Sequence, residues 1–172
     1  PGRIAVLGFA LGGSTAMEIS GARASLEAYA GYCDSYGKWD CAWFVGGRGY
    51  VDDTPVDVDK LDLRTVDKAR FEQSNRDPRI KGAVLVDPGL AQAYVEDSLK
   101  AIAIPMHFIN LGSKETIPLA VASEPLAALT PKGSYATVAG ADHFSFLPIC
   151  KDGAAELLES FGEVDPICGT TE

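Results

Sequence analysis

The stretch of sequence that decides the fold is R-I-A-V-L-G-F-A-L-G-G-S, residues 3–14. Residues 3–7 form a short, apolar and β-branched run of the kind that parallel sheets bury. Residues 8–13 are rich in glycine and predict a tight turn, and the helical pattern of residues 14–22 follows at once. A strand that turns through glycines into a helix is the beginning of an α/β sheet.

Three further apolar runs repeat this alternation along the chain. We expect strands over residues 80–86, 104–111 and 134–138, and helices over residues 91–102, 119–129 and 154–161. The intervening segment predicts a helix over 26–43 that breaks at Gly37, a loop over 45–54 and an exposed helix over 58–71. Together these elements predict a mostly parallel, doubly wound sheet, and residues 1–172 belong to part of a single domain.

The glycine-rich turn has the composition of a nucleophile elbow that lacks its nucleophile. In the motif G-x-S-x-G, a serine stands at the tip of a sharp strand-to-helix turn. Gly8 and Gly12 occupy the two glycine positions, Gly13 follows them, and Ala10 replaces the serine. We interpret Ala10 as an inactivating serine-to-alanine replacement, with a natural ligand-binding pseudoenzyme as the alternative. Ser14 lies one helical turn further on and is expected to belong to the helix rather than to replace the nucleophile.

An acid and a histidine follow in the chain order of an α/β-hydrolase triad. Asp87 ends the second strand, and His143 lies in the loop after the last strand. Because sites in parallel sheets form at the carboxyl ends of the strands, we expect both side chains near Ala10. His143 would act as the base, Asp87 would orient its ring, and the backbone N–H of Leu11 would donate to an oxyanion.

Other residues compete for these roles. Glu115 is the alternative acid, His107 is expected to be structural because it lies inside a strand, and Asp87 could be a plain turn former before Pro88 and Gly89. A dinucleotide site is disfavoured, because G-x-x-x-G-G does not match G-x-G-x-x-G. A cluster of aromatic residues could line an acyl pocket or pack a helix on the sheet: Trp39, Trp43, Phe44 and Tyr50.

Composition narrows the range of partners and compartments. The chain has 15 Lys and Arg against 24 Asp and Glu, a net charge of −9 that disfavours nucleic acid and anionic membrane surfaces as partners. No stretch approaches the roughly 20 apolar residues of a membrane span. The spacing of the four cysteines favours two local disulfides, Cys33–Cys41 and Cys150–Cys168, over a zinc site, and so a periplasmic or secreted protein. No metal or organic cofactor is expected.

Four segments in sequence order resemble a known family. They are G-F-A-L-G-G at 8–13, D-P-R-I-K-G-A-V-L-V-D-P-G at 77–89, I-P-M-H-F-I-N-L-G at 104–112 and A-D-H-F-S-F-L at 141–147. Together they resemble the C-terminal half of the bacterial predicted dienelactone hydrolases and of the platelet-activating-factor acetylhydrolases, within the α/β-hydrolase superfamily.

The resemblance implies hydrolysis of a carboxylic ester, or of a lactone or amide, through an acyl-serine intermediate. Its departures from the family are the alanine at position 10 and the absence of the family's first half. We therefore expect a second polypeptide that carries this N-terminal half and the second oxyanion donor. The opening Pro1-Gly2-Arg3 is typical of a chain that has been cut or processed.

Overall fold

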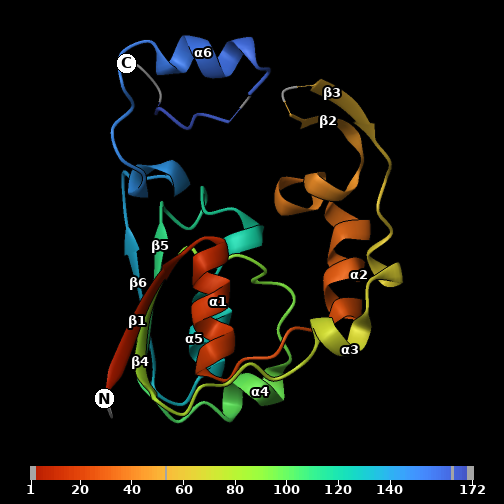
Figure 1. Ribbon diagram of the computed structural model, residues 1–172. Helices are drawn as coiled ribbons and strands as arrows, with labels where there is room; N and C mark the ends of the chain where they lie inside the picture. Colours follow the sequence, from red (N-terminus) through yellow and green to blue (C-terminus); the bar gives the residue numbers. More distant parts are fainter. Residues whose placement is uncertain (1–2, 53, 164, 170–172) are drawn as a thin grey trace.

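The structure, a computed structural model, describes residues 3–52, 54–163 and 165–169. Its centre is a four-stranded, all-parallel sheet in the order β1-β4-β5-β6 (Figure 1). The four strands span Ile4–Phe9, Ile80–Val86, Met106–Leu111 and Gly133–Val138. Each strand joins the next through a connection that contains a helix, so the expected α/β class is confirmed.

The register of the sheet aligns the carboxyl ends of its strands. Phe9 at the end of β1 pairs with Val86 at the end of β4, and Val86 pairs with Ile109 of β5. Leu111 pairs in turn with Val138 at the end of β6. The loops that leave all four strands therefore begin at one edge of the sheet, where they can build a common site.

Three helices pack on one face of this sheet: α1 (Leu11–Ser20), α4 (Glu96–Lys100) and α5 (Glu124–Leu129). Their apolar side chains share one core with the strands, built around Met17, Leu85, Leu99, Phe108 and Leu126. The strand order advances in one direction, and right-handed crossovers then place every helix on the same side. Within the described residues the sheet is thus covered on one face, and the expected double winding is not seen.

The opposite face of the sheet is only partly covered. Leu7 pairs with Val84, which pairs with His107, and this row points away from the helical core. Leu7 is 62% exposed, and Val84 and His107 are intermediate in exposure. At the carboxyl end of the same face, Phe9 stacks on Phe146 of the 3-10 helix η4 (His143–Phe146). Parallel sheets normally bury both faces. This face therefore exposes more apolar surface than is usual for a parallel sheet.

A long excursion separates α1 from β4. It contains α2 (Leu26–Tyr36), the 3-10 helix η1 (Trp39–Phe44), the hairpin of β2 (Gly47–Val51) and β3 (Thr54–Val58), the 3-10 helix η2 (Leu63–Thr65) and α3 (Lys68–Phe71). Ser25 caps the start of α2 by accepting from the backbone N–H of Ala28, and Gly37 ends the helix in the left-handed conformation.

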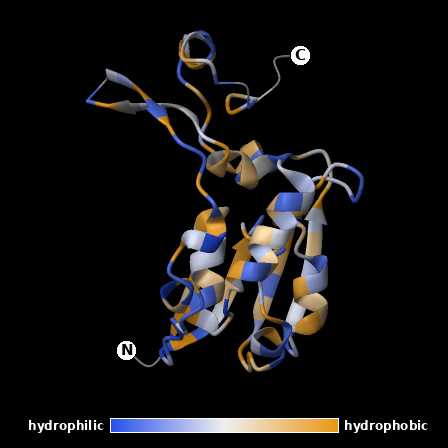
Figure 2. Cartoon of the chain, turned by 90° about the vertical axis from the view of Figure 1, so that its right-hand side faces the viewer, coloured by the Kyte–Doolittle hydropathy of each residue, from blue (hydrophilic) through white to orange (hydrophobic). Residues whose placement is uncertain are grey.

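The hairpin replaces the loop expected over 45–54, and β3, η2 and α3 replace the exposed helix expected over 58–71. Antiparallel pairing of Gly47–Val51 with Thr54–Val58 satisfies the backbone of this segment. The hairpin and the C-terminal helix α6 (Ala154–Ser160) extend beyond the carboxyl ends of the strands (Figures 1 and 2).

The helix expected over 91–102 is reduced to the five residues of α4. The residues before it form a turn and an isolated antiparallel bridge between Tyr94 and Ala24, and the Ala93 carbonyl accepts from the Ser25 N–H. Similarly, the helix expected over 119–129 divides into the 3-10 helix η3 (Leu119–Val121) and α5.

Both expected disulfides are present. Cys33–Cys41 joins α2 to η1, and Cys150–Cys168 closes the segment that carries α6. In the described part of the chain, no helix is both long and apolar enough to cross a membrane.

Candidate active site

The backbone at Ala10 is strained at the turn between β1 and α1. Ala10 has φ 50° and ψ −121°. Residues other than glycine rarely adopt this combination, which costs on the order of 1–3 kcal/mol. A Cβ at Gly8 would lie 2.1 Å from the Gly12 carbonyl oxygen, and a Cβ at Gly13 would lie 2.7 Å from the Pro88 Cα. Gly8 and Gly13 are therefore required for the close approach of strand and helix. A Cβ at Gly12 would meet no atom outside its own helix, so packing does not require the glycine at this position of the motif.

Hydrogen bonds tie this elbow to the strand that precedes the acid. The Ala10 N–H donates to the Val86 carbonyl at 3.1 Å, and the Gly89 N–H donates to the Ala10 carbonyl at 2.9 Å. Ser14 is buried, and its hydroxyl donates to the same carbonyl at 3.5 Å. Ser14 thus serves the helix start, and it does not line the cavity beside Ala10.

Asp87 and His143, 56 residues apart in the chain, meet at the carboxyl edge of the sheet. The His143 Nδ1 lies 2.9 Å from the Asp87 Oδ2. Asp87 is fully buried with φ 41°, whereas the His143 side chain is about one-fifth exposed. His143 begins η4, which Asp142 caps through a reciprocal capping box with Ser145. This arrangement leaves the other ring nitrogen of His143 available for a substrate or nucleophile.

A network around Asn110 fixes the other oxygen of Asp87. Asn110, fully buried near the end of β5, donates to the Asp87 Oδ1 at 2.8 Å, and the Leu111 N–H donates to the same atom at 2.9 Å. The Asn110 amide also donates to the Val121 carbonyl. Its oxygen accepts from three donors: the Ser123 N–H, the Ser123 hydroxyl and the Tyr135 hydroxyl. No role for Asn110 was predicted from the sequence. A single amide in the mostly apolar run M-H-F-I-N-L is nevertheless a signal for a buried side chain with hydrogen-bond partners.

Aromatic contacts position the ring of His143. Its centroid lies 4.7 Å from that of Phe9 and 5.5 Å from that of Phe144, which meets it edge-on. Phe9 immediately precedes Ala10, so the same short segment contacts the histidine and lines the cavity beside it. The imidazole is therefore held both by the Asp87 carboxylate and by rings on its flank.

Ala10 and His143 line one cavity of about 740 Å³, a volume typical of small-molecule sites. Much of the lining is apolar and comes from the loops at the sheet edge, including Leu11, Leu90, Pro118, Ala120, Val121 and Phe144. Leu11 is the first residue of α1, so its N–H has no carbonyl within the helix to accept it. That N–H lies at the positive end of the helix dipole, where it is available to a negatively charged oxygen in the cavity.

The competing residues lie elsewhere. Glu115 is exposed and accepts from the Ser113 hydroxyl at 2.8 Å, outside the lining of this cavity. His107 binds the Ser134 hydroxyl at 2.7 Å on the partly covered face of the sheet. Among the described residues, no group of three or more His, Cys, Asp or Glu side chains is arranged to hold a metal ion.

Of the aromatic cluster, Phe44 packs edge-on against Tyr29 at 5.9 Å and so contributes to the packing of α2. The side chains of Trp39, Trp43 and Tyr50 lie outside what the structure describes.

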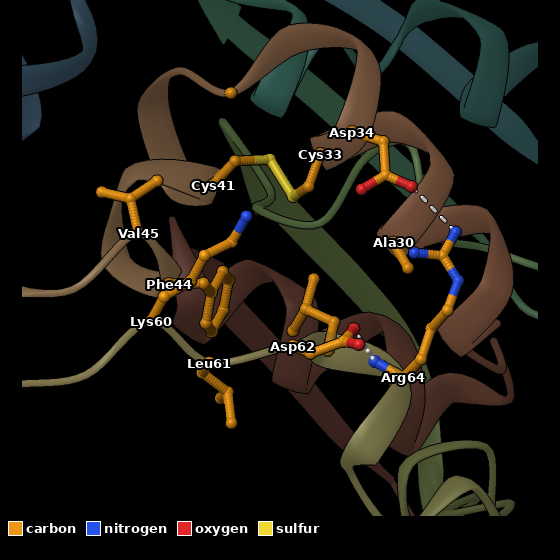
Figure 3. Close-up of a pocket in the computed structure, with 12 residues that line it drawn as sticks. Ala30, Cys33, Asp34, Cys41, Phe44, Val45, Lys60, Leu61, Asp62 and Arg64 are labelled. Atoms are coloured by element: carbon orange, nitrogen blue, oxygen red, sulfur yellow. Dashed lines mark hydrogen bonds and ion pairs between the residues drawn. A yellow bond between two sulfur atoms is a disulfide. The ribbon is translucent and has the colours of Figure 1, made fainter.

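A second hollow, of about 400 Å³, lies beside the Cys33–Cys41 disulfide (Figure 3). Arg64 at its rim forms ion pairs with Asp34 at 2.9 Å and Glu27 at 3.2 Å. It has no lining residue in common with the cavity at Ala10, and its arginine is already paired.

Comparison with known proteins found no family model, no curated protein and no solved structure that matches this chain.

Proposed function

We propose that this chain is the C-terminal part of an α/β-hydrolase that cleaves carboxylic esters, or lactones or amides, with Ala10 at the position of its nucleophilic serine. The observation that carries the proposal is the meeting of three chain-distant features at one sheet edge. These are the strained turn at Ala10, the 2.9 Å contact of Asp87 with His143, and the cavity that Ala10 and His143 share.

The roles of the residues follow from this geometry. With serine at position 10, His143 would remove the hydroxyl proton while the oxygen attacks the ester carbonyl, and the oxyanion would accept from the Leu11 N–H. His143 would return the proton to the leaving alcohol, and water would then release the acid from the acyl-serine by the reverse sequence. Asp87 would hold the ring orientation and stabilise the imidazolium.

The test is hydrolysis of short-chain p-nitrophenyl esters by the complete protein, in which this chain is joined by the polypeptide that carries the N-terminal half, with Ala10→Ser compared with the unaltered form. We expect a burst of nitrophenol and then turnover from Ala10→Ser, and near-background rates from Ala10. Adding Ser14→Ala to Ala10→Ser is the matched control, since it removes the neighbouring hydroxyl that the proposal leaves unused. A fluorophosphonate probe should label Ala10→Ser at residue 10 by peptide mapping. Equal inertness of both forms, with no labelling, would refute the elbow assignment.

A binding function without turnover is the second candidate, and the alanine at position 10 is the observation that favours it. The cavity beside Ala10 is formed although the hydroxyl is absent. Calorimetric titration of the unaltered chain with carboxylic acids and esters tests this candidate. Tight binding, together with an alanine codon in the natural gene, would favour it over the enzyme.

We also propose that a polypeptide equivalent to the N-terminal half of a hydrolase domain packs on the partly covered sheet face. β1 is an edge of the sheet, and Leu7 on this face is 62% exposed. An open edge beside an apolar face is a surface that proteins normally pair or cover. Sedimentation of the chain with and without such a polypeptide tests this, and a stable, soluble monomer on its own would refute it.

The disulfides Cys33–Cys41 and Cys150–Cys168 support a periplasmic or secreted location, because such bonds persist in oxidising compartments. Thiol labelling of protein isolated under alkylating conditions would test this proposal. Four free thiols would contradict it.

A further inference from the structure

A buried carboxylate that the proposed chemistry does not use lies at the wall of the cavity. Asp40 belongs to η1 and lines the same cavity as Ala10 and His143, although it is 30 residues beyond the elbow in the chain. It is only 9% exposed. The Cys33–Cys41 disulfide anchors the next residue to α2, so η1 has a covalently fixed position.

Two tyrosines of α2 hold the carboxylate of Asp40. The Tyr29 hydroxyl donates to Oδ2 at 3.1 Å and the Tyr32 hydroxyl to Oδ1 at 3.4 Å. Burial raises the pKa of Asp40, while the tyrosine hydrogen bonds act in the opposite direction. Burial and the neighbouring carboxylate raise the pKa of Tyr32 to about 12, so its hydroxyl remains a donor at neutral pH.

These neutral donors orient the carboxylate but leave its charge unbalanced. In the described part of the chain, no lysine, arginine or histidine nitrogen forms an ion pair with Asp40. A buried carboxylate without a cation is costly, and proteins normally compensate such a charge. The compensating cation can be supplied by a ligand in the cavity that Asp40 lines.

The charged residues that line the cavity are mostly acidic. Besides Asp40 and the histidine, the charged lining residues are Lys38, Glu163 and Asp165. Three of the four non-histidine charges are thus acidic, against one lysine. An acidic wall beside an apolar lining attracts a molecule that is apolar over most of its length and positive at one point.

We propose that Asp40 is a specificity-determining residue that selects esters carrying a protonated amine over uncharged esters of the same shape. The proposal deepens the proposed function, since it concerns the same cavity, but equilibrium binding tests it without any turnover. Tyr29 and Tyr32 are its positioning residues, because they hold the carboxylate by hydrogen bonds but do not themselves line the cavity.

The experiment is calorimetric titration of the complete protein, this chain together with the polypeptide that carries the N-terminal half, with two esters of equal shape; the unaltered Ala10 prevents turnover. These are 2-(dimethylammonio)ethyl butanoate, which is protonated at pH 7, and uncharged 3-methylbutyl butanoate. We expect the charged ester to bind at least about tenfold more tightly, as is typical of a hydrogen bond to a charged group. Asp40→Asn should abolish this preference while keeping an oxygen for the tyrosines.

Asp34→Asn is the matched control, because it removes the same charge from an exposed carboxylate that pairs with Arg64 outside this cavity (Figure 3). It should retain the full preference. If Asp40→Asn does not fold, judged by its thermal unfolding, Lys38→Met replaces it and should strengthen the preference by removing the lysine of the cavity lining.

Equal affinity for the two esters, or no binding of either, would overturn the proposal. So would a preference that neither Asp40→Asn nor Lys38→Met alters. Hydrolysis of the uncharged ester by Ala10→Ser would, in each of these cases, leave the proposed function standing.

Discussion

Replacing Asn110 by alanine tests whether the buried network, rather than the acid alone, maintains the site. The change leaves three groups without a partner in a region closed to water: the Val121 carbonyl, the Ser123 N–H and the Ser123 hydroxyl. Each unsatisfied buried group costs about 1–3 kcal/mol. Because the serine hydroxyl can rotate to another acceptor, we expect a total loss of about 4 kcal/mol in the free energy of unfolding.

For a chain of this size, such a loss lowers the Tm by about 8–16 °C. Urea denaturation gives the free energy directly, with Asn75→Ala as the matched control. Asn75 is an exposed asparagine whose amide makes one side-chain bond, to Glu18, so its removal should cost under about 1 kcal/mol.

The same replacement should separate kcat from KM in the Ala10→Ser background. Asp87 would keep its bonds to Leu111 and His143 but lose the amide that fixes Oδ1, so kcat should fall about 10- to 100-fold with KM nearly unchanged. An unfolding free energy within about 1 kcal/mol of the parent would refute the network. A stability loss without a change in kcat would refute its positioning role alone.

Three further perturbations test the elbow, the acid and the nearer disulfide. Gly8→Ala should cost at least about 3 kcal/mol in urea denaturation, because its Cβ would lie 2.1 Å from a backbone carbonyl, whereas Gly12→Ala should be tolerated. In the Ala10→Ser background, Asp87→Asn should lower kcat for p-nitrophenyl esters on the order of 10⁴-fold, because it disturbs the tautomer of the histidine. The paired change Cys33→Ser with Cys41→Ser should cost about 2–3 kcal/mol, from the loop of nine residues it reopens.

Each of these expectations has an outcome that contradicts it. Equal stability of the two alanine variants would mean that strand and helix do not approach at position 8. An Asp87→Asn enzyme of normal rate would return the acid role to Glu115. A disulfide-free variant of unchanged stability would show that α2 and η1 are held by packing alone.

The sheet was predictable from sequence because its signals are local. β4 spans the expected residues, since an apolar run lies between the charged Arg79 and the abrupt Asp87-Pro88-Gly89. The end of α2 was equally predictable, because Gly37 is the residue type that favours a helix end. In the structure it adopts φ 57°, a conformation that disfavours other residues. The two disulfides followed from cysteine spacing.

Elements that depend on distant partners were not predictable. The turn and bridge at 91–95 pair with residues from another part of the chain, since Tyr94 bridges to Ala24 and the Ala93 carbonyl accepts from the Ser25 N–H. The sequence does carry a signal for the hairpin, since Val56 and Val58 alternate with Asp57, and Asp52 is a residue type that turns favour. The absence of double winding depends on strand order, which periodicity does not encode.

For the candidate site, sequence order placed Ala10, Asp87 and His143 after the first, second and fourth expected strands, and the structure brings them to one edge. The contribution of Asn110 requires knowing that the end of β5 faces Asp87, which is information about register rather than composition. The role of Asp40 could not be predicted from the sequence either. Its partners Tyr29 and Tyr32 lie in α2 whereas Asp40 lies in η1, and no sequence motif links them.

The hydrogen bond from the Leu111 N–H to Asp87 makes the formation of the site depend on the register of β4 and β5. Asp87 leaves β4 while Leu111 ends β5, so their 2.9 Å contact exists only in the native register of those two strands. A slip of one residue would turn Asn110 to the other face and leave the carboxylate without its amide partner. During refolding, a compact chain with misaligned strands would therefore have ordinary secondary structure but no formed site. Ligand binding at this cavity can then measure the fraction of molecules with the native strand register. Circular dichroism would not distinguish them from misaligned molecules, because both have the same secondary structure.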